Sequence, residues 1–203
     1  HTRATLLKLA CLLHDIAKPA TRTVEESGRI RFFGHHSEGA AMVRSILERL
    51  RMSRRTTKAI ETMAEHHMSP GQMSQGAELA TLRAIYRYFR SADDVAVDTL
   101  YLNLADYLSA RGALLQRDEW ESYAGRVQHI LETGMHQKKE PPLPRLIDGH
   151  QLMALLDLTP GPTVGRLLEA IREAQATGEI VTEEEALASA KEILTADPEA
   201  RNA

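Results

Sequence analysis

The chain has 203 residues, a formal net charge of −3 and 43% hydrophobic residues, enough to bury one good core and a small appendage. No segment approaches the roughly 18 uninterrupted apolar residues of a membrane span and the start has no signal-peptide pattern, so we expect a cytoplasmic globular protein without membrane partners. The net charge argues against a protein that binds nucleic acid over its whole surface, so any RNA contact must be local.

The first apolar run, residues 6–13, ends in the doublet His14-Asp15. Because proline disfavours helical geometry at the preceding residue, Pro19 predicts that this helix stops near Lys18, with the doublet in its last, irregular turn. At such a turn an imidazole and a carboxylate on consecutive residues can converge on one cation. A carboxylate in an apolar setting is unfavourable unless it is paired, and a divalent metal is one such partner. The doublet therefore predicts half of a metal site.

Segment 21–33 lacks the period of a helix, and we expect either an irregular loop or a short hairpin over the site. A new apolar period begins at Gly39, so His35 is expected at the entrance of the next helix. This position makes His35 a candidate ligand.

A third helix, which Ser53 can cap, ends in the pair His66-His67. Ile60, Met63 and His67 are spaced to share one face, so His67 is expected to point inward. His67 is preferred to His66 as the ligand for this reason.

Asp106 lies in the run 100–108, which is apolar on nearly every side and is therefore expected at the centre of the fold. A carboxylate in that position needs a partner. The candidate donors combine imidazole and carboxylate without thiolate, which favours Mg, Mn, Fe, Ni or Zn over a structural zinc knot. The expected ligand set is His14, Asp15, His35, His67 and Asp106.

Two further helices are expected over residues 79–89 and 120–131, the second stopping at Gly134. A proline-rich segment beyond it excludes helix and marks a boundary. We expect a first domain over 1–137, a linker over 138–147 and a small helical module over 148–203.

Four short motifs carry a family resemblance. They are His14-Asp15, a Gly-His-x-x-x-Gly-Ala segment at 34–40, the helix-ending pair His66-His67 and an Ala-Asp pair at 105–106. Together they resemble the HD-domain metal phosphohydrolases. More narrowly, segments 12–19, 33–35, 67–70, 104–106, 148–153, 159–165 and 178–187 look like the HD and C-terminal regions of bacterial tRNA nucleotidyltransferases, the CCA-adding enzymes, and related poly(A) polymerases.

The resemblance implies an all-α fold, an HD-domain helical bundle with a small helical C-terminal appendage. It also implies a divalent metal ion and hydrolysis of nucleotide or RNA phosphate esters, such as nucleotide 2′-phosphates or 2′,3′-cyclic phosphates, with tRNA as a partner. A divalent cation suits this chemistry because it lowers the pKa of bound water and polarises a phosphoryl oxygen. Asp15 and Lys18 are the expected catalytic residues, although Lys18 is equally well interpreted as a solvated lysine at a helix end.

The chain departs from the family pattern in two ways. The family's nucleotidyl-transferring head has no counterpart here, so this chain alone is not expected to add nucleotides. The family's first ligand histidine lies on a helix well upstream of the doublet, and His1 is too close to Asp15 to take its place. We therefore expect either a fragment of a longer polypeptide or a chain that lost its first helix, with His1 a relic of an affinity tag.

Two segments are candidates for local RNA contact. Arg54, Arg55 and Lys58 gather with other arginines near an exposed helix start, where positive charge can hold phosphates. An ordinary solvated turn is the alternative, favoured by the lack of interleaved aromatic residues. Gly161 and Gly165 flank another helix start that can either seat a phosphate or serve only as a helix start, and the resemblance favours RNA contact.

Three functional hypotheses follow. The chain is a metal-dependent phosphohydrolase, or the tRNA-supporting half of a nucleotidyltransferase in which the HD residues are vestigial, or a regulatory or dimerisation module in which metal only stabilises the fold. Metal-dependent hydrolysis, metal-independent tRNA binding, and metal-dependent stability without either activity distinguish them.

Overall fold

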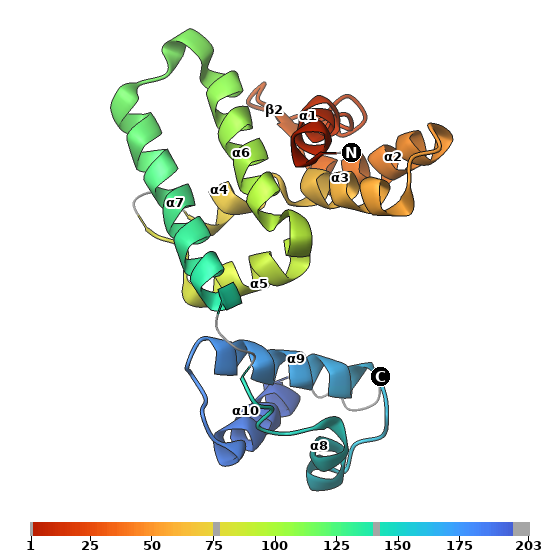
Figure 1. Ribbon diagram of the computed structural model, residues 1–203, viewed down its shortest axis with the longest axis vertical. Coiled ribbons are helices and arrows are strands. Elements are labelled where there is room, and N and C mark those ends of the chain that lie inside the picture. The colour runs from red at the N-terminus through yellow and green to blue at the C-terminus, as the bar shows by residue number, and fades with distance from the viewer. Residues whose placement is uncertain (1, 75–77, 140–142, 197–203) are drawn as a thin grey trace. The chain divides into compact units, whose positions relative to one another are not determined.

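The computed structural model describes residues 2–74, 78–139 and 143–196. Helices dominate this part of the chain (Figure 1), which confirms the all-α fold class. The chain divides into two compact units, residues 1–134 and 135–203. His1, residues 140–142 of the expected linker and residues 197–203 lie outside the described part.

The first unit is built from helices and one small hairpin. Strands β1 (Arg22–Val24) and β2 (Ile30–Phe32) pair antiparallel, so the segment left open between loop and hairpin is a hairpin. The helices are α1 (Arg3–Leu13), α2 (His35–Arg49), α3 (Arg54–His66), α4 (Ser69–Met73), α5 (Leu82–Ala92), α6 (Ala96–Arg111) and α7 (Arg117–Lys139), with short 3-10 turns η1 (Asp93–Val95) and η2 (Gly112–Leu114) on either side of α6. The boundary between the two units falls within α7, after residue 134.

Several helices of this unit begin at a hydroxyl side chain. Thr2, Ser53 and Thr81 each accept a hydrogen bond, over 3.2 Å, from the backbone N–H three residues later, at the starts of α1, α3 and α5. Such a cap satisfies one of the amides that a helix start leaves without a partner. The expected cap at Ser53 is confirmed.

Helices α1, α2, α3 and α6 share one apolar core. Val43 and Leu47 of α2 and Ile60 and Met63 of α3 are fully buried, and Leu102 of α6 packs with them. Burying a side chain of this kind contributes about 1.5–3 kcal/mol. This packing brings together the ends of helices that lie far apart along the chain.

Helix α7 does not stop at Gly134 but continues to Lys139. The backbone of α7 lies so close to α5 that a Cβ atom at Gly134 would be 2.0 Å from Cε2 of Phe89. Glycine is therefore needed here for close helix packing, and the expectation that it ends the helix is wrong.

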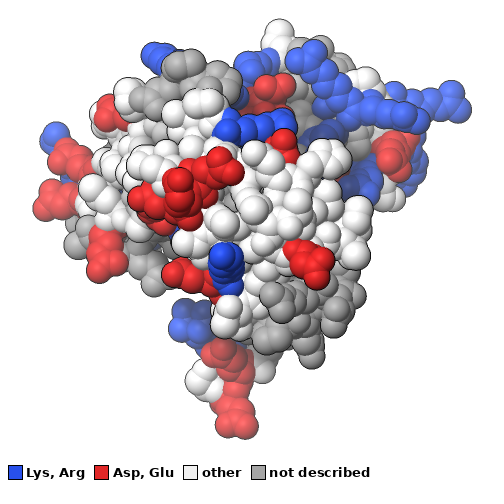
Figure 2. Space-filling view, turned by 90° about the horizontal axis from the view of Figure 1, so that it is seen from below, with Lys and Arg blue, Asp and Glu red and all other residues white. Residues whose placement is uncertain are grey.

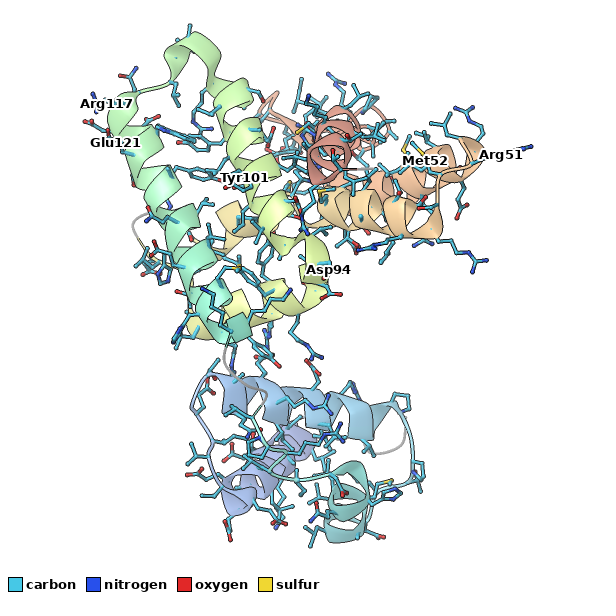
Figure 3. The ribbon with its side chains drawn as sticks, in the orientation of Figure 1. Arg51, Met52, Asp94, Tyr101, Arg117 and Glu121 are labelled. Carbon is cyan, nitrogen blue, oxygen red and sulfur yellow. The ribbon has the colours of Figure 1, made fainter. Side chains whose placement is uncertain are left out.

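Helix α6 contacts α1, α3, α4 and α5, which agrees with a central position. It is not buried on every side, because Tyr101 is 56% exposed (Figure 3), and Leu108 is also exposed. Thr99, Leu102 and Asn103 are buried instead. The apolar composition of α6 indicated a central helix correctly, but it did not indicate which residues face solvent.

The second unit contains α8 (Gly149–Leu156), α9 (Pro162–Ala176) and α10 (Glu183–Ala196). Its core is aliphatic, with Leu152, Leu167, Ile171, Ala190 and Leu194 among its buried residues. None of the described helices, in either unit, is long and apolar enough to cross a membrane.

Candidate metal centre

The His14-Asp15 doublet follows the end of α1 directly. The helix ends at Leu13 rather than near Lys18, and the chain continues in turns with Ile16 N–H donating to Leu13 O over 3.1 Å and Lys18 N–H to Asp15 O over 3.0 Å. Because the regular helix has ended, the two neighbouring side chains of the doublet meet. Nε2 of His14 lies 3.2 Å from Oδ2 of Asp15.

The three histidines expected as ligands share one hydrogen-bond arrangement. In His14, His35 and His67 the Nδ1–H group donates to the backbone carbonyl three residues earlier, over 2.9, 2.7 and 2.7 Å. A carbonyl oxygen can only accept, so the proton is on Nδ1 and Nε2 remains for another partner. Metal-binding histidines commonly have their second nitrogen fixed in this way.

These Nε2 atoms converge on Asp15. His35 Nε2 lies 3.4 Å and His67 Nε2 3.8 Å from Oδ1 of Asp15. From α6, Oδ1 of Asp106 lies 3.5 Å from His14 Nε2. The structure therefore brings all five residues of the expected ligand set into one cluster, and ligand atoms of His14, Asp15 and His67 lie within 4.8 Å of one another.

Three polar atoms in this cluster indicate which kind of ligand it can bind. His14 Nε2, His35 Nε2 and Asp15 Oδ1 are buried and have no hydrogen-bond partner among the described residues. Buried polar atoms are normally satisfied, and leaving one unsatisfied costs about 1–3 kcal/mol. In a neutral imidazole, Nε2 directs a lone pair at the facing carboxylate oxygen, which is repulsive unless a proton or a metal cation lies between them. The residues present therefore fit a divalent cation with nitrogen and oxygen ligands.

The carboxylates also set the protonation of this cluster. Burial opposes the charged form of His14, but Asp106 and Asp15 together raise its pKa to about 10. Burial likewise opposes ionisation of Asp15, but His14 and Lys18 hold the pKa of that carboxyl well below its usual range. Burial lowers the pKa of His67 to about 4, so this ring stays neutral with its lone pair available. Any cation that binds here must displace a proton from His14.

Lys18 lies at the edge of the cluster. Its Nζ donates to Oδ2 of Asp15 over 2.5 Å and is 5.8 Å from the centre of the Phe32 ring on the hairpin. The side chain is 38% exposed. Lys18 therefore contacts the cluster and also reaches solvent, whereas a purely solvated lysine would make no contact with the cluster.

The residues expected to bind RNA do not join the metal cluster. Arg54, Arg55 and Lys58 are exposed on the first turns of α3, beside the α2–α3 turn that contains Arg51 (Figure 3). In the second unit, Gly161 and Gly165 are exposed at the start of α9. Figure 2 shows acidic and basic side chains interspersed on the face it presents. These positions are compatible with local phosphate contacts and do not test them.

The structure adds two residues whose roles the sequence did not reveal. At Gly39 a Cβ atom would lie 3.4 Å from the carbonyl oxygen of His14, within ordinary van der Waals contact, so this position of α2 packs directly against the doublet. Asn103 is buried on α6 and its amide donates to the carbonyl oxygen of His67 over 2.9 Å. The sequence feature that could have indicated this role is the position of Asn103, three residues before Asp106 and on the same face of an apolar helix.

Comparisons with known proteins show which sequences this chain resembles. The chain is 37% identical over 182 residues to the CC-adding tRNA nucleotidyltransferase of Thermus thermophilus, covering 89% of this chain and 38% of that protein. It is 36% identical over 184 residues to the A-adding tRNA nucleotidyltransferase of Deinococcus radiodurans, covering 90% of this chain and 40% of that protein. The chain thus spans about two fifths of the length of these curated relatives. Residues 1–111 match the HD domain family, and because this match covers more than half of the chain and includes the whole metal cluster, the chain belongs to the HD domain family.

Proposed function

We propose that the chain is a divalent-metal-dependent phosphohydrolase domain that acts on nucleotide or RNA-end phosphate esters, as the C-terminal part of a tRNA nucleotidyltransferase-like protein. The observation that carries this proposal is the convergence of buried, unsatisfied polar atoms from the turn after α1 and the start of α2. Burying such a set is unfavourable unless a proton or a metal cation lies between the facing lone pairs.

His14, Asp15, His35, His67 and Asp106 would hold the metal, with Mg, Mn, Ni, Fe and Zn as the candidates. A divalent cation supplies Lewis acidity, lowering the pKa of water and polarising a phosphoryl oxygen. Asp15, whose pKa lies below its usual range, stays ionised at neutral pH and therefore orients its cationic neighbours rather than donating a proton. Lys18 lies in contact with Asp15 and solvent, where its ammonium can bind an oxygen of an incoming phosphoryl group.

The test is hydrolysis by the purified chain of bis(p-nitrophenyl) phosphate and of 2′,3′-cyclic AMP, with added Mn, Ni or Mg. We expect activity that chelation abolishes and that Asp106→Asn lowers about 100-fold or more, because removing even the supporting groups of a metal site costs 10–100-fold. The matched control is Asp94→Asn, on the surface at η1 (Figure 3), which should retain full activity. Inactivity with every metal, or equal activity of both variants, contradicts the proposal.

A second function, tRNA binding, is favoured by the relatives, whose names describe them as tRNA nucleotidyltransferases. We propose tRNA as a partner, with Arg54, Arg55 and Lys58 binding phosphates and the α9 start at Gly161 and Gly165 as a second contact. Such a partner fits the cytoplasmic location expected from the sequence.

Filter binding to tRNA at several salt concentrations tests this partner. Replacing Arg54, Arg55 and Lys58 by Gln should weaken binding and reduce the salt slope by about one for each phosphate that is no longer neutralised. The control is Arg117→Gln, which removes an exposed arginine that pairs with Glu121 over 2.7 Å (Figure 3). Binding that survives chelation without any hydrolysis would favour a catalytically silent tRNA-supporting domain.

A further inference from the structure

The end of α3 leaves its last carbonyl groups without partners inside the helix, as every helix end does. Two of them are satisfied through His67. The carbonyl of Ala64 accepts from His67 Nδ1 over 2.7 Å, and the carbonyl of His67 itself accepts from Asn103 Nδ2 over 2.9 Å. His67 is only 1% exposed, so water does not readily replace either bond. Both the ring and the backbone of this metal-site residue are therefore held.

Asn103 is itself oriented by a tyrosine on α7. The hydroxyl of Tyr123 donates to Oδ1 of Asn103 over 2.6 Å, and both residues are buried. With Oδ1 engaged by this donor, the amide group must present Nδ2 to the carbonyl of His67. A reversed amide would place its oxygen against that carbonyl oxygen, so Tyr123 selects the productive orientation.

Tyr123 is fixed by packing independently of its hydroxyl. Its ring stacks on Tyr107 with 3.7 Å between ring centres and 15° between planes, and the guanidinium of Arg111 lies 3.4 Å from the centre of the Tyr107 ring. At Gly71 in α4, a Cβ atom would lie 3.1 Å from the Tyr123 hydroxyl. The hydroxyl is thus presented to Asn103 from a rigid aromatic stack.

We propose that Asn103 and Tyr123 are positioning residues for the metal centre, acting through the backbone of His67 without contacting the metal. Asn103 and Asp106 lie three residues apart on α6, so the same helix face fixes one ligand and presents another. This inference rests on the proposed metal site and deepens it. Loss of either residue weakens metal binding beyond its effect on folding.

The experiment compares Tyr123→Phe with Tyr88→Phe. Tyr88 is a matched control, because it is also buried and its hydroxyl also donates to one partner, the carbonyl of Ala96, over 2.7 Å. Both substitutions remove one buried hydroxyl and keep the ring. The dissociation constant for Co²⁺ is measured by visible absorption, and the melting temperature of the metal-free chain by circular dichroism.

We expect Tyr123→Phe to weaken Co²⁺ binding about tenfold and Tyr88→Phe to leave it unchanged, while both lower the melting temperature by similar amounts. Asn103→Ala should weaken binding about 10–100-fold. Adding Tyr123→Phe to Asn103→Ala should cause no further loss, because Tyr123 acts through Asn103.

Equal Co²⁺ affinities for the two tyrosine variants, or independent losses in the double variant, would overturn the positioning role. If Asn103→Ala does not fold, the two tyrosine variants decide the question alone. Absence of Co²⁺ binding by the unaltered chain would overturn the metal centre and this inference together. Intact Co²⁺ binding without hydrolysis would overturn the proposed activity alone.

Discussion

Both units contain helix starts that are capped by their own side chains, but helix ends of the first unit also carry side chains that meet at a common centre. In the first unit the ends of α1 and α3 and the start of α2 carry His14, His67 and His35, whose Nε2 atoms point at a common carboxylate. In the second unit the polar group at a helix end bonds to its own helix. Asp148 at the start of α8 accepts from the backbone of Gln151 over 2.9 Å, and the side chain of Gln151 accepts from the backbone of Asp148 over 2.9 Å.

The difference indicates where to look for chemistry in a helical protein. A reciprocal cap satisfies a helix start locally and leaves nothing for a ligand. In the metal cluster, His14 Nε2 and Asp15 Oδ1 are buried without a hydrogen-bond partner among the described residues, which is unfavourable for the fold unless a proton or a metal cation lies between the facing groups. A functional site is thus recognised by groups that their own helix does not satisfy.

A large loss of metal affinity is expected for His67→Ala. Removing a buried ligand should lower the affinity for Mn²⁺ about 100-fold or more, measured by titration calorimetry. The matched control, His150→Ala, replaces an exposed histidine of α8 in the second unit and should bind Mn²⁺ normally. Equal affinities would show that His67 is an ordinary core histidine.

A change in the core of the second unit is Leu167→Ala in α9. The side chain of Leu167 is 1% exposed. It should lower the free energy of unfolding by about 2–5 kcal/mol, because it leaves a cavity in an aliphatic core, while Mn²⁺ affinity stays the same. Urea denaturation measures the loss, and Leu155→Ala, at a 53% exposed position, should change it by less than about 0.5 kcal/mol. A loss of Mn²⁺ affinity in Leu167→Ala would mean that the second unit supports the metal centre.

Two glycines of α7 have different surroundings within the first unit. Gly134→Ala places a methyl group against Phe89 and should destabilise the protein by about 1–3 kcal/mol. Gly125→Ala has no described atom within 4 Å of its new Cβ and should stabilise the protein by about 0.4–1 kcal/mol through helix propensity. The melting temperatures of the two variants, measured by thermal denaturation, should shift in opposite directions. A stabilising Gly134→Ala would contradict the close packing of α5 on α7.

Metal affinity is also expected to depend on pH. His14, with a pKa of about 10, holds a proton throughout the neutral range, and a metal ion must displace it. Affinity for Mn²⁺ should therefore rise about tenfold per pH unit between about pH 6 and 8, with one proton released on binding. An affinity that stays constant over this range would show that no proton is displaced from His14.

The local features of this protein could be predicted from its sequence because their physical causes are local. The cap at Ser53, the helix start at His35 and the inward face of His67 follow from side-chain chemistry and helical periodicity over a few residues. The same periodicity could not show that α7 passes through Gly134. That result depends on Phe89, which lies on a different helix.

Local sequence patterns were enough to indicate the helical fold class and the candidate ligands. The packing of the helices places Asp106 3.5 Å from His14, directs Nε2 of each histidine at Asp15, and lets Asn103 hold His67 from another helix. These outcomes depend on how four helices pack, and packing is set by side chains that are distant along the chain. Helix periodicity specifies which face of a helix is buried, but not which partner that face will meet.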